Sequence, residues 1–304
     1  MKKKLLITGG SGLLAVNWAC SARDKFAVNL AMHDRKITLP GVDTLPFSLD
    51  SVGGVVAALR EISPDYVVHT AGLTNVDLCE KEPELARYIN AELAGNVAKA
   101  CGDVGVQLAH ISTDHLFAGD QEMLEENNPL QPVNMYGKTK AEGEEQVLDV
   151  NPEALVVRTN FYGWGTSYRQ SFSDMIIGTL KKQGELNLFD DVFYTPILAD
   201  VLARTVLDLL SMKASGVYHV VGDDRVSKYQ FGIEVAERFG FDLSLINRSK
   251  LTSISTLTRR PADMSLSNAK LCRALGRDVG GVKEHLNLLY QQQESGLAEV
   301  IQSL

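Results

Sequence analysis

Tyr136 and Lys140 lie four positions apart, and Ser112-Thr113-Asp114 precedes them in the chain. If the segment is helical, the phenol and the ammonium lie on one helix face and can act together in proton transfer to a carbonyl oxygen. Because a free tyrosine has a pKa of about 10, this role requires a neighbour that favours the phenolate, and Lys140 would supply that charge. Thr113 would hold the carbonyl oxygen, with Ser112 as a second hydroxyl. On spacing alone, a packed tyrosine and a solvated lysine explain the pattern equally well.

A glycine-rich turn near the N-terminus indicates where a cofactor would bind. The apolar run Leu5-Leu6-Ile7 predicts a buried parallel strand, and Gly9, Gly12 and Ala15 follow it with G-x-x-G-x-x-A spacing. Such spacing permits a tight turn, close approach of a pyrophosphate to a helix N-terminus, and close packing of helix on strand. No Lys-Ser or Lys-Thr pair follows, which excludes a Walker-type P-loop. A dinucleotide site is favoured over an ordinary turn, with these expected contacts: Gly9, Ser11, Gly12 and Leu13.

Charged residues after the second predicted strand, Ala27 to Met32, bear on the choice of cofactor. Asp34 lies about 20 positions after the glycines, where an acidic residue usually holds the adenosine ribose diol, and this favours NADH. Arg35 and Lys36 could instead accommodate the 2′-phosphate of NADPH. A solvated charge cluster is a third interpretation. The sequence therefore leaves both NADH and NADPH open, with Asp34 and Arg35 as candidate contacts.

The rest of the N-terminal half alternates between predicted strands and helices. Tyr66 to His69 is a strand that ends in small residues, Thr70-Ala71-Gly72-Leu73-Thr74, over which a cofactor could lie. A helix is expected from Pro83 to Cys101, and the strand Val104 to Ile111 brings Ser112-Thr113-Asp114 to the same sheet edge. This alternation predicts an α/β fold with a Rossmann-type, doubly wound parallel sheet. Ala71 and Gly72 are expected cofactor contacts.

From Phe161 onward the alternation is less regular, which predicts a second, smaller α/β domain covering the cofactor edge. We expect residues 1–165 to form the NAD(P)-binding domain, with 195–222 returning to it. Residues 166–194 and 223–304 would form the substrate-binding domain. The elements predicted in this half are helices at Ser171 to Lys182, Ile197 to Met212, Ser227 to Phe239 and Asn268 to Leu275, and a strand at Gly216 to Val221.

Composition limits the possible partners. The 304 residues are 45% hydrophobic and carry a formal net charge of -8, which argues against general binding of nucleic acid or membrane surfaces. Four scattered cysteines without a CxxC pair indicate a reducing compartment, and the six histidines lack metal-ligand spacing. The N-terminus lacks the apolar run of a signal peptide or membrane span, so a cytoplasmic protein without a metal site is expected. A homodimer is plausible as the commonest oligomer.

Several segments together resemble the extended short-chain dehydrogenase/reductases and, within them, the dTDP-4-dehydrorhamnose reductase family. The pieces Ser112-Thr113-Asp114 and Tyr136-Gly137-Lys138-Thr139-Lys140 are quite specific in combination, whereas the glycine turn alone is not. The similarity covers nearly the whole chain. The other matching segments are Thr8 to Ala15, Pro64 to Val68, Thr74 to Asp77 with Cys79-Glu80, Ile89 to Ala91, His115 to Gly119, Asn134-Met135, Arg158 to Asn160, Tyr194 to Pro196 and Arg259-Arg260-Pro261.

This resemblance implies a Rossmann domain that binds NADPH or NADH and a C-terminal domain that closes over a nucleotide-diphosphate sugar, a 4-keto-6-deoxyhexose. It implies Thr113, Tyr136 and Lys140 as the catalytic residues. Tyr136 and Lys140 would also contact the cofactor, and Leu49 would contact its adenine. A guanidinium can grip phosphate oxygens bidentately, so Arg260 suits the nucleotide diphosphate. The substrate contacts that it implies are Thr74, Ser112, His115, Asn160 and Arg260.

Departures from the family pattern gather around the expected pockets. His115 replaces a usual tyrosine, and Phe161 replaces a usual tryptophan. Ser48 to Ser51 replaces an aspartate-led segment near the adenine, and His69 to Gly72 replaces Asn-Ala-Ala-Ala. Two other interpretations therefore stay open beside a reductase. One is a nucleotide-sugar epimerase or dehydratase that recycles its cofactor, and the other is a non-catalytic regulatory subunit that keeps the fold.

Overall fold

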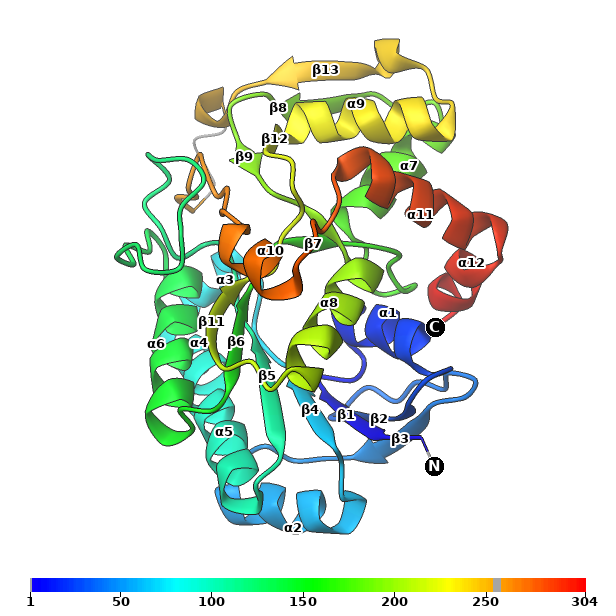
Figure 1. Ribbon diagram of the computed structural model, residues 1–304. Helices are drawn as coiled ribbons and strands as arrows, with labels where there is room; N and C mark the ends of the chain where they lie inside the picture. The colour runs from blue at the N-terminus through cyan, green and yellow to red at the C-terminus, as the bar shows by residue number, and fades with distance from the viewer. Residues whose placement is uncertain (1, 254–257) are drawn as a thin grey trace.

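A seven-stranded parallel sheet forms the centre of the computed structural model, which describes residues 2–253 and 258–304 (Figure 1). The strand order is β11-β6-β5-β4-β1-β2-β3, and every pairing in this sheet is parallel. Its inner strands are short apolar runs buried on both faces, as expected where helices cover both sides. The predicted Rossmann-type α/β class is confirmed. The strands are β1 (Lys4–Thr8), β2 (Ala27–Met32), β3 (Asp43–Pro46), β4 (Tyr66–His69), β5 (Gln107–Ile111), β6 (Leu155–Arg158) and β11 (Gly216–His219).

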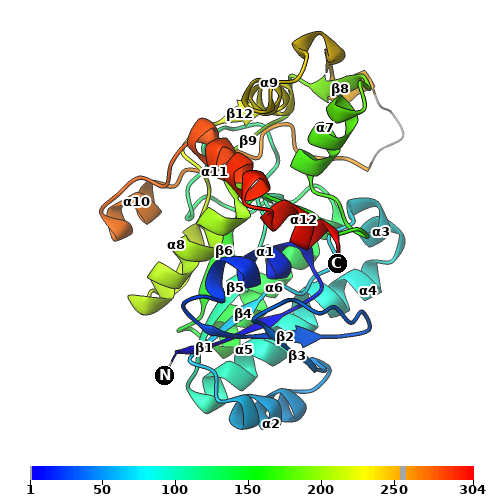
Figure 2. The same cartoon turned by 90° about the vertical axis from the view of Figure 1, so that its right-hand side faces the viewer.

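Helices cover the two faces of this sheet (Figure 2). Leu5 and Ile7 of β1 pack with α1 (Leu13–Ala22) and α8 (Ala199–Ser211) in one core cluster. Leu6, which points to the opposite face, packs with three other helices in a second cluster. Those helices are α2 (Val52–Ile62), α5 (Leu93–Val104) and α6 (Met135–Val150).

The helical segment before β5 differs in detail from the expected helix over Pro83 to Cys101. It consists of α4 (Pro83–Arg87), a π-helical turn (Tyr88–Glu92) and α5, and α3 (Val76–Lys81) precedes it. Helix α5 continues to Val104 and ends at Gly105, whose φ of 72° supplies the left-handed cap, so β5 starts at Gln107 rather than at the predicted Val104.

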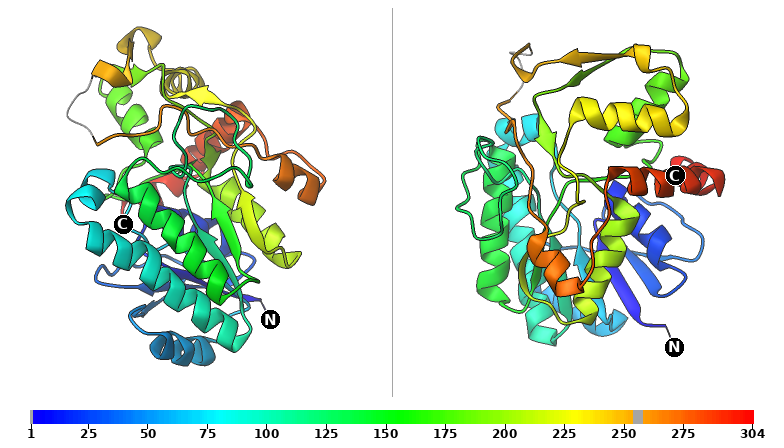
Figure 3. Two further views of the ribbon diagram at one scale, coloured as in Figure 1. Left: turned by 90° about the vertical axis from the view of Figure 1, so that its left-hand side faces the viewer. Right: turned by 45° about the horizontal axis from the view of Figure 1, so that its top comes forward.

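Most of the remaining elements lie over the carboxyl edge of the central sheet (Figure 3). Phe231 is fully buried there against the rings of Tyr162, Phe172 and Tyr194. These elements are β7 (Phe161–Tyr162), α7 (Phe172–Lys181), β8 (Leu186–Phe189), β9 (Phe193–Tyr194), β10 (Ile197–Leu198), β12 (Val226–Ser227), α9 (Lys228–Phe239), η2 (Leu243–Leu245), β13 (Ile246–Ser249), η3 (Leu251–Ser253), α10 (Ala269–Leu275), α11 (Val282–Glu294) and α12 (Leu297–Gln302).

We expected a helix to start at Ile197. Ile197 and Leu198 instead form strand β10, which pairs with β7, and helix α8 starts at Ala199. Residues 195–222 nevertheless contribute α8 and β11 to the layers of the central sheet. The division into domains 1–165, 166–194 and 223–304 stays a prediction. Among the described residues, no helix is long and apolar enough to cross a membrane, and no cluster of His, Cys, Asp or Glu side chains could hold a metal ion.

Candidate active site

A cleft of about 690 Å³ lies at the carboxyl ends of β1, β4 and β5. In open parallel sheets this edge is the usual position of a bound ligand. Three of the residues predicted from the sequence do not line it: Asp34, Arg35 and Arg260. The predicted residues that do line it are Gly9, Ser11, Gly12, Leu13, Leu49, Ala71, Gly72, Thr74, Ser112, Thr113, His115, Tyr136, Lys140 and Asn160.

The glycine turn between β1 and α1 is shaped to admit a phosphate group. Gly9 has a φ of 71°, and a Cβ there would come within 2.8 Å of the Ala71 backbone. The Gly12 amide donates a hydrogen bond to the Gly9 carbonyl over 2.8 Å. Gly12 is also the N-cap of α1, and no side chain caps the amides of that first turn. Free amides at a helix N-terminus bind anions, so these residues fit the pyrophosphate of a dinucleotide.

Tyr136 lies in the first turn of α6, which begins as its sequence predicts. The Asn134 side chain accepts a hydrogen bond from the Gly137 amide over 2.9 Å and so caps the helix. The Tyr136 ring packs with Val76 and neighbouring apolar side chains. Burial raises the pKa of Tyr136 to about 12, although the Thr113 hydroxyl opposes this rise. The phenol therefore keeps its proton at neutral pH, which suits a proton donor.

Lys140 is buried and donates a hydrogen bond to the Ile111 carbonyl at the end of β5, over 2.8 Å. Burial lowers the pKa of Lys140 to about 8, and the Glu144 carboxylate opposes that shift. The expected effect of Lys140 on the pKa of Tyr136 stays a prediction. The Arg169 cation lowers the pKa of Tyr136, but its effect is smaller than that of burial.

Asp114 connects the residues on the substrate side of the cleft, a role that the sequence did not indicate. Its side chain is 2% exposed and accepts hydrogen bonds from the Thr113 hydroxyl over 3.2 Å and from the Asn160 amide. The His115 ring stands edge-on to the Tyr136 ring, with centroids 5.4 Å apart. Burial lowers the pKa of His115, so its ring is neutral. The Ser112 hydroxyl is buried without a hydrogen-bond partner among the described residues.

The side chains of Asp34 and Arg35 lie in different surroundings. The Asp34 side chain is 91% exposed and pairs with His33, and it is His33 that lines the cleft. The Arg35 guanidinium instead lies 3.9 Å from the centroid of the Tyr168 ring, and the Tyr168 hydroxyl donates to the Ser11 carbonyl over 2.8 Å. Tyr168 thus holds Arg35 beside the glycine turn.

Two further arginines lie near the substrate side. Arg169 lines the cleft and donates a hydrogen bond to the Thr74 hydroxyl. Arg260 lies outside the lining, and its guanidinium pairs with Asp77 in the first turn of α3 over 3.2 Å. Sequence reasoning did not identify Tyr168 or Arg169, because no local motif marks the loop that carries them.

The sequence model of the RmlD substrate binding domain family matches residues 3–295. Probable low-salt glycan biosynthesis reductase Agl14 of Haloferax volcanii is 33% identical over 277 residues, which cover 89% of this chain and 91% of the relative. dTDP-4-dehydrorhamnose reductase of Escherichia coli strain K12 is 32% identical over 252 residues, which cover 78% of this chain and 84% of the relative.

A solved structure shows the same arrangement of elements. The crystal structure of dTDP-4-dehydrorhamnose reductase from Bacillus anthracis in complex with NADP is similar to this chain with a TM-score of 0.84 and 25% identity. The similarity covers 96% of this chain and 100% of the other. The chain therefore belongs to the RmlD substrate binding domain family, in agreement with the resemblance of its motifs to the dTDP-4-dehydrorhamnose reductases.

Proposed function

We propose that the protein is an NAD(P)H-dependent reductase of a nucleotide-activated 4-keto-6-deoxy sugar. The observation that carries this proposal is the convergence of Thr113, Tyr136 and Lys140 on the cleft that also contains the glycine turn. The relatives named as dTDP-4-dehydrorhamnose reductases support it, and so does the neighbour solved with NADP. The keto sugar would lie between Tyr136 and the elements above the sheet edge.

A reduced nicotinamide bound in the cleft would supply the hydride for C4 of the sugar and would itself be oxidised. Tyr136 gives its phenolic proton to the C4 oxygen, so that the C=O bond becomes a C–H and an O–H bond. Thr113 would hold that oxygen by turning its hydroxyl proton from the Asp114 carboxylate to the sugar, and Asp114 orients the Asn160 amide. A tyrosine whose pKa is about 12 carries the proton at neutral pH, which is the form this step needs.

Oxidation of NADPH in the presence of dTDP-4-dehydrorhamnose tests this function. We expect loss of NADPH absorbance and one product molecule with a C4 hydroxyl for each NADPH consumed. The control without sugar should leave NADPH unchanged. A protein that converts the sugar to an isomer while it retains NAD and consumes no NADPH would instead be an epimerase.

Arg35 should make the enzyme prefer NADPH. Its guanidinium is held beside the glycine turn by Tyr168, whereas Asp34 points into solvent. Arg35→Gln should lower kcat/KM for NADPH by about 10- to 100-fold, the range for one hydrogen bond to a charged group, and leave that for NADH unchanged. Steady-state kinetics with each cofactor measures this. The opposite pattern, in which Asp34→Asn impairs NADH use and Arg35→Gln has no effect, would assign the ribose contact to Asp34.

A further inference from the structure

The Arg169 guanidinium lies at the cleft, where a neutral group holds it. It donates a hydrogen bond to the Thr74 hydroxyl, and both residues line the cleft. Of the described residues that line this cleft, two are lysine or arginine: Lys140 and Arg169. The Lys140 ammonium is buried and is bonded to a backbone carbonyl, whereas Arg169 is exposed. Arg169 is therefore the better placed of the two to bind an anionic ligand.

The backbone that carries Arg169 forms a tight turn. The Thr166 amide donates to the Arg169 carbonyl over 3.0 Å, and the Arg169 amide donates to the Thr166 carbonyl over 3.2 Å. A Cβ on Gly165 would overlap the Arg169 carbonyl oxygen, so this return of the chain requires a glycine there. The Tyr168 hydroxyl bonds the turn to the Ser11 carbonyl over 2.8 Å. These contacts fix the point from which the guanidinium reaches the cleft.

The partner of Arg169 connects it to the end of the cleft that contains Tyr136. Thr74 lies two positions before Val76, whose side chain packs with the Tyr136 ring. The charge of Arg169 also lowers the pKa of Tyr136. Arg35, by contrast, is held beside the glycine turn, where the cofactor phosphates are expected. The Arg169 guanidinium thus lies on the side of the cleft where the keto sugar would react.

Arg260, which the family resemblance implies as the contact of the nucleotide diphosphate, is engaged elsewhere. Its guanidinium lies outside the cleft lining and pairs with the Asp77 carboxylate over 3.2 Å. The charge of Arg260 is therefore already offset. The backbone just before it is also held, because the Asn134 side chain donates to the Arg259 carbonyl over 2.9 Å.

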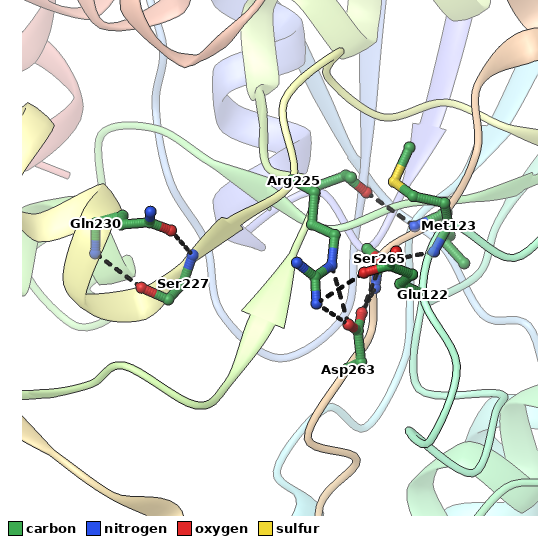
Figure 4. Close-up of polar contacts among 9 residues, drawn as sticks. Glu122, Met123, Arg225, Ser227, Gln230, Asp263 and Ser265 are labelled. Atoms are coloured by element: carbon green, nitrogen blue, oxygen red, sulfur yellow. Dashed lines mark hydrogen bonds and ion pairs between the residues drawn. The ribbon is translucent and has the colours of Figure 1, made fainter.

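The segment after Arg260 is held by hydrogen bonds around Asp263 (Figure 4). The Arg225 guanidinium donates to the Asp263 carboxylate from Nε over 3.0 Å, and the Ser265 amide donates to the same carboxylate over 2.9 Å. The Met123 amide donates in turn to the Ser265 hydroxyl over 2.8 Å. The backbone on both sides of Arg260 is thus fixed, with its guanidinium beside a carboxylate rather than in the cleft.

We propose that Arg169 and Thr74 bind the diphosphate of the nucleotide sugar, in the place that the resemblance assigns to Arg260. This inference rests on the proposed reductase function and identifies residues that would hold its substrate. A guanidinium has five N–H donors in a planar fork, and one bond to Thr74 leaves others to grip phosphate oxygens side by side. Because Thr74 accepts from Arg169, its own hydroxyl proton can be donated to the same phosphate. In the described part of the chain, the partner of this guanidinium is a hydroxyl rather than a carboxylate, which matches an anionic ligand.

Arg169→Gln tests the proposal in the protein saturated with NADPH. We expect the dissociation constant of dTDP and the KM for dTDP-4-dehydrorhamnose to rise by about 10- to 100-fold, the effect of losing hydrogen bonds between charged groups. The dissociation constant of thymidine, which lacks phosphate, should not change. A general disturbance of the cleft would weaken both ligands, so the ratio of the two constants, measured by calorimetric titration, isolates the diphosphate contact. Arg169→Lys keeps the charge but not the planar fork and should show an intermediate loss.

Arg204→Gln is the matched control, because Arg204 is 50% exposed, pairs within α8 and lies outside the cleft lining. Its dTDP affinity should stay at the wild-type value. Thr74→Val removes the hydroxyl that orients Arg169 and should cause a smaller loss than Arg169→Gln. The double variant should lose less than the product of the two separate factors, because the two groups are bonded to each other.

The outcomes separate this proposal from the function on which it rests. Equal dTDP affinity in the wild type and Arg169→Gln would overturn the role of Arg169 and leave the reductase function standing. A greater loss in Arg260→Gln than in Arg169→Gln would return the diphosphate to Arg260. Weaker binding of NADPH with unchanged binding of dTDP would assign Arg169 to the cofactor pyrophosphate and also overturn the proposal. If the wild type binds dTDP but does not oxidise NADPH with the sugar, the reductase function fails, and the dTDP titrations still decide the role of Arg169.

Discussion

Tyr136→Phe should lower kcat for sugar reduction by roughly 10²- to 10⁴-fold, the contribution typical of a positioned general acid. The variant loses only the phenolic O–H group, and the ring still packs with Val76 and Cys79. NADPH affinity should therefore stay at the wild-type level, because the glycine turn and Lys140 are unchanged. Single-turnover kinetics with excess enzyme measures the chemical step, and fluorescence titration measures the cofactor affinity.

Tyr290→Phe provides the matched control for this loss. Tyr290 lies on α11, where its ring stacks on Arg238 and takes no part in the cleft. Removing the Tyr290 hydroxyl in this variant should leave kcat unchanged. Full turnover in Tyr136→Phe would show that another group protonates the sugar oxygen, and the proposed mechanism would then be wrong.

Arg158→Met should reduce the free energy of unfolding by about 3–5 kcal/mol, the usual effect of leaving one member of a buried ion pair alone. Arg158 and Glu144 are 5% and 4% exposed, and the guanidinium donates to the carboxylate from both Nε and Nη2. Without Arg158, the Glu144 carboxylate stays buried between α6 and β6 without the guanidinium that pairs with it. Urea denaturation followed by circular dichroism measures the change.

Arg204→Met is the matched control, because Arg204 is 50% exposed and its pair with Asp200 lies within one helix. We expect a loss of less than about 1 kcal/mol there. Replacing both members, in Arg158→Met with Glu144→Gln, should recover part of the stability, since no unpaired charge then remains buried. If Arg158→Met were as stable as Arg204→Met, the buried pair would not contribute to the fold.

The elements of the sheet could be predicted from the sequence because their signals are local. β2 occupies Ala27–Met32 and β4 occupies Tyr66–His69, at the predicted residues, since apolar runs bounded by glycine, proline or charge are typical of buried parallel strands. The caps are local as well: Ser51 caps α2 and Ser227 caps α9 because each serine side chain accepts a hydrogen bond from an amide in the first turn of its own helix. The boundary between α5 and β5 was wrong because the predicted strand began at Val104 and so included Gly105, which ends the helix in a left-handed cap.

Spacing and residue type in the sequence were sufficient to locate the glycine turn, Thr113, Tyr136 and Lys140, because parallel strands bring their carboxyl ends to one edge. Only the tertiary structure shows that Asp34 points into solvent, that Arg35 rests on Tyr168, and that Asp114 connects Thr113 to Asn160. These contacts join residues far apart in the chain. The pKa of a side chain likewise depends on which remote segments bury it, as for Tyr136 and Lys140. Patterns in the sequence reflect interactions between residues a few positions apart, whereas tertiary packing decides which residues distant in the chain come into contact.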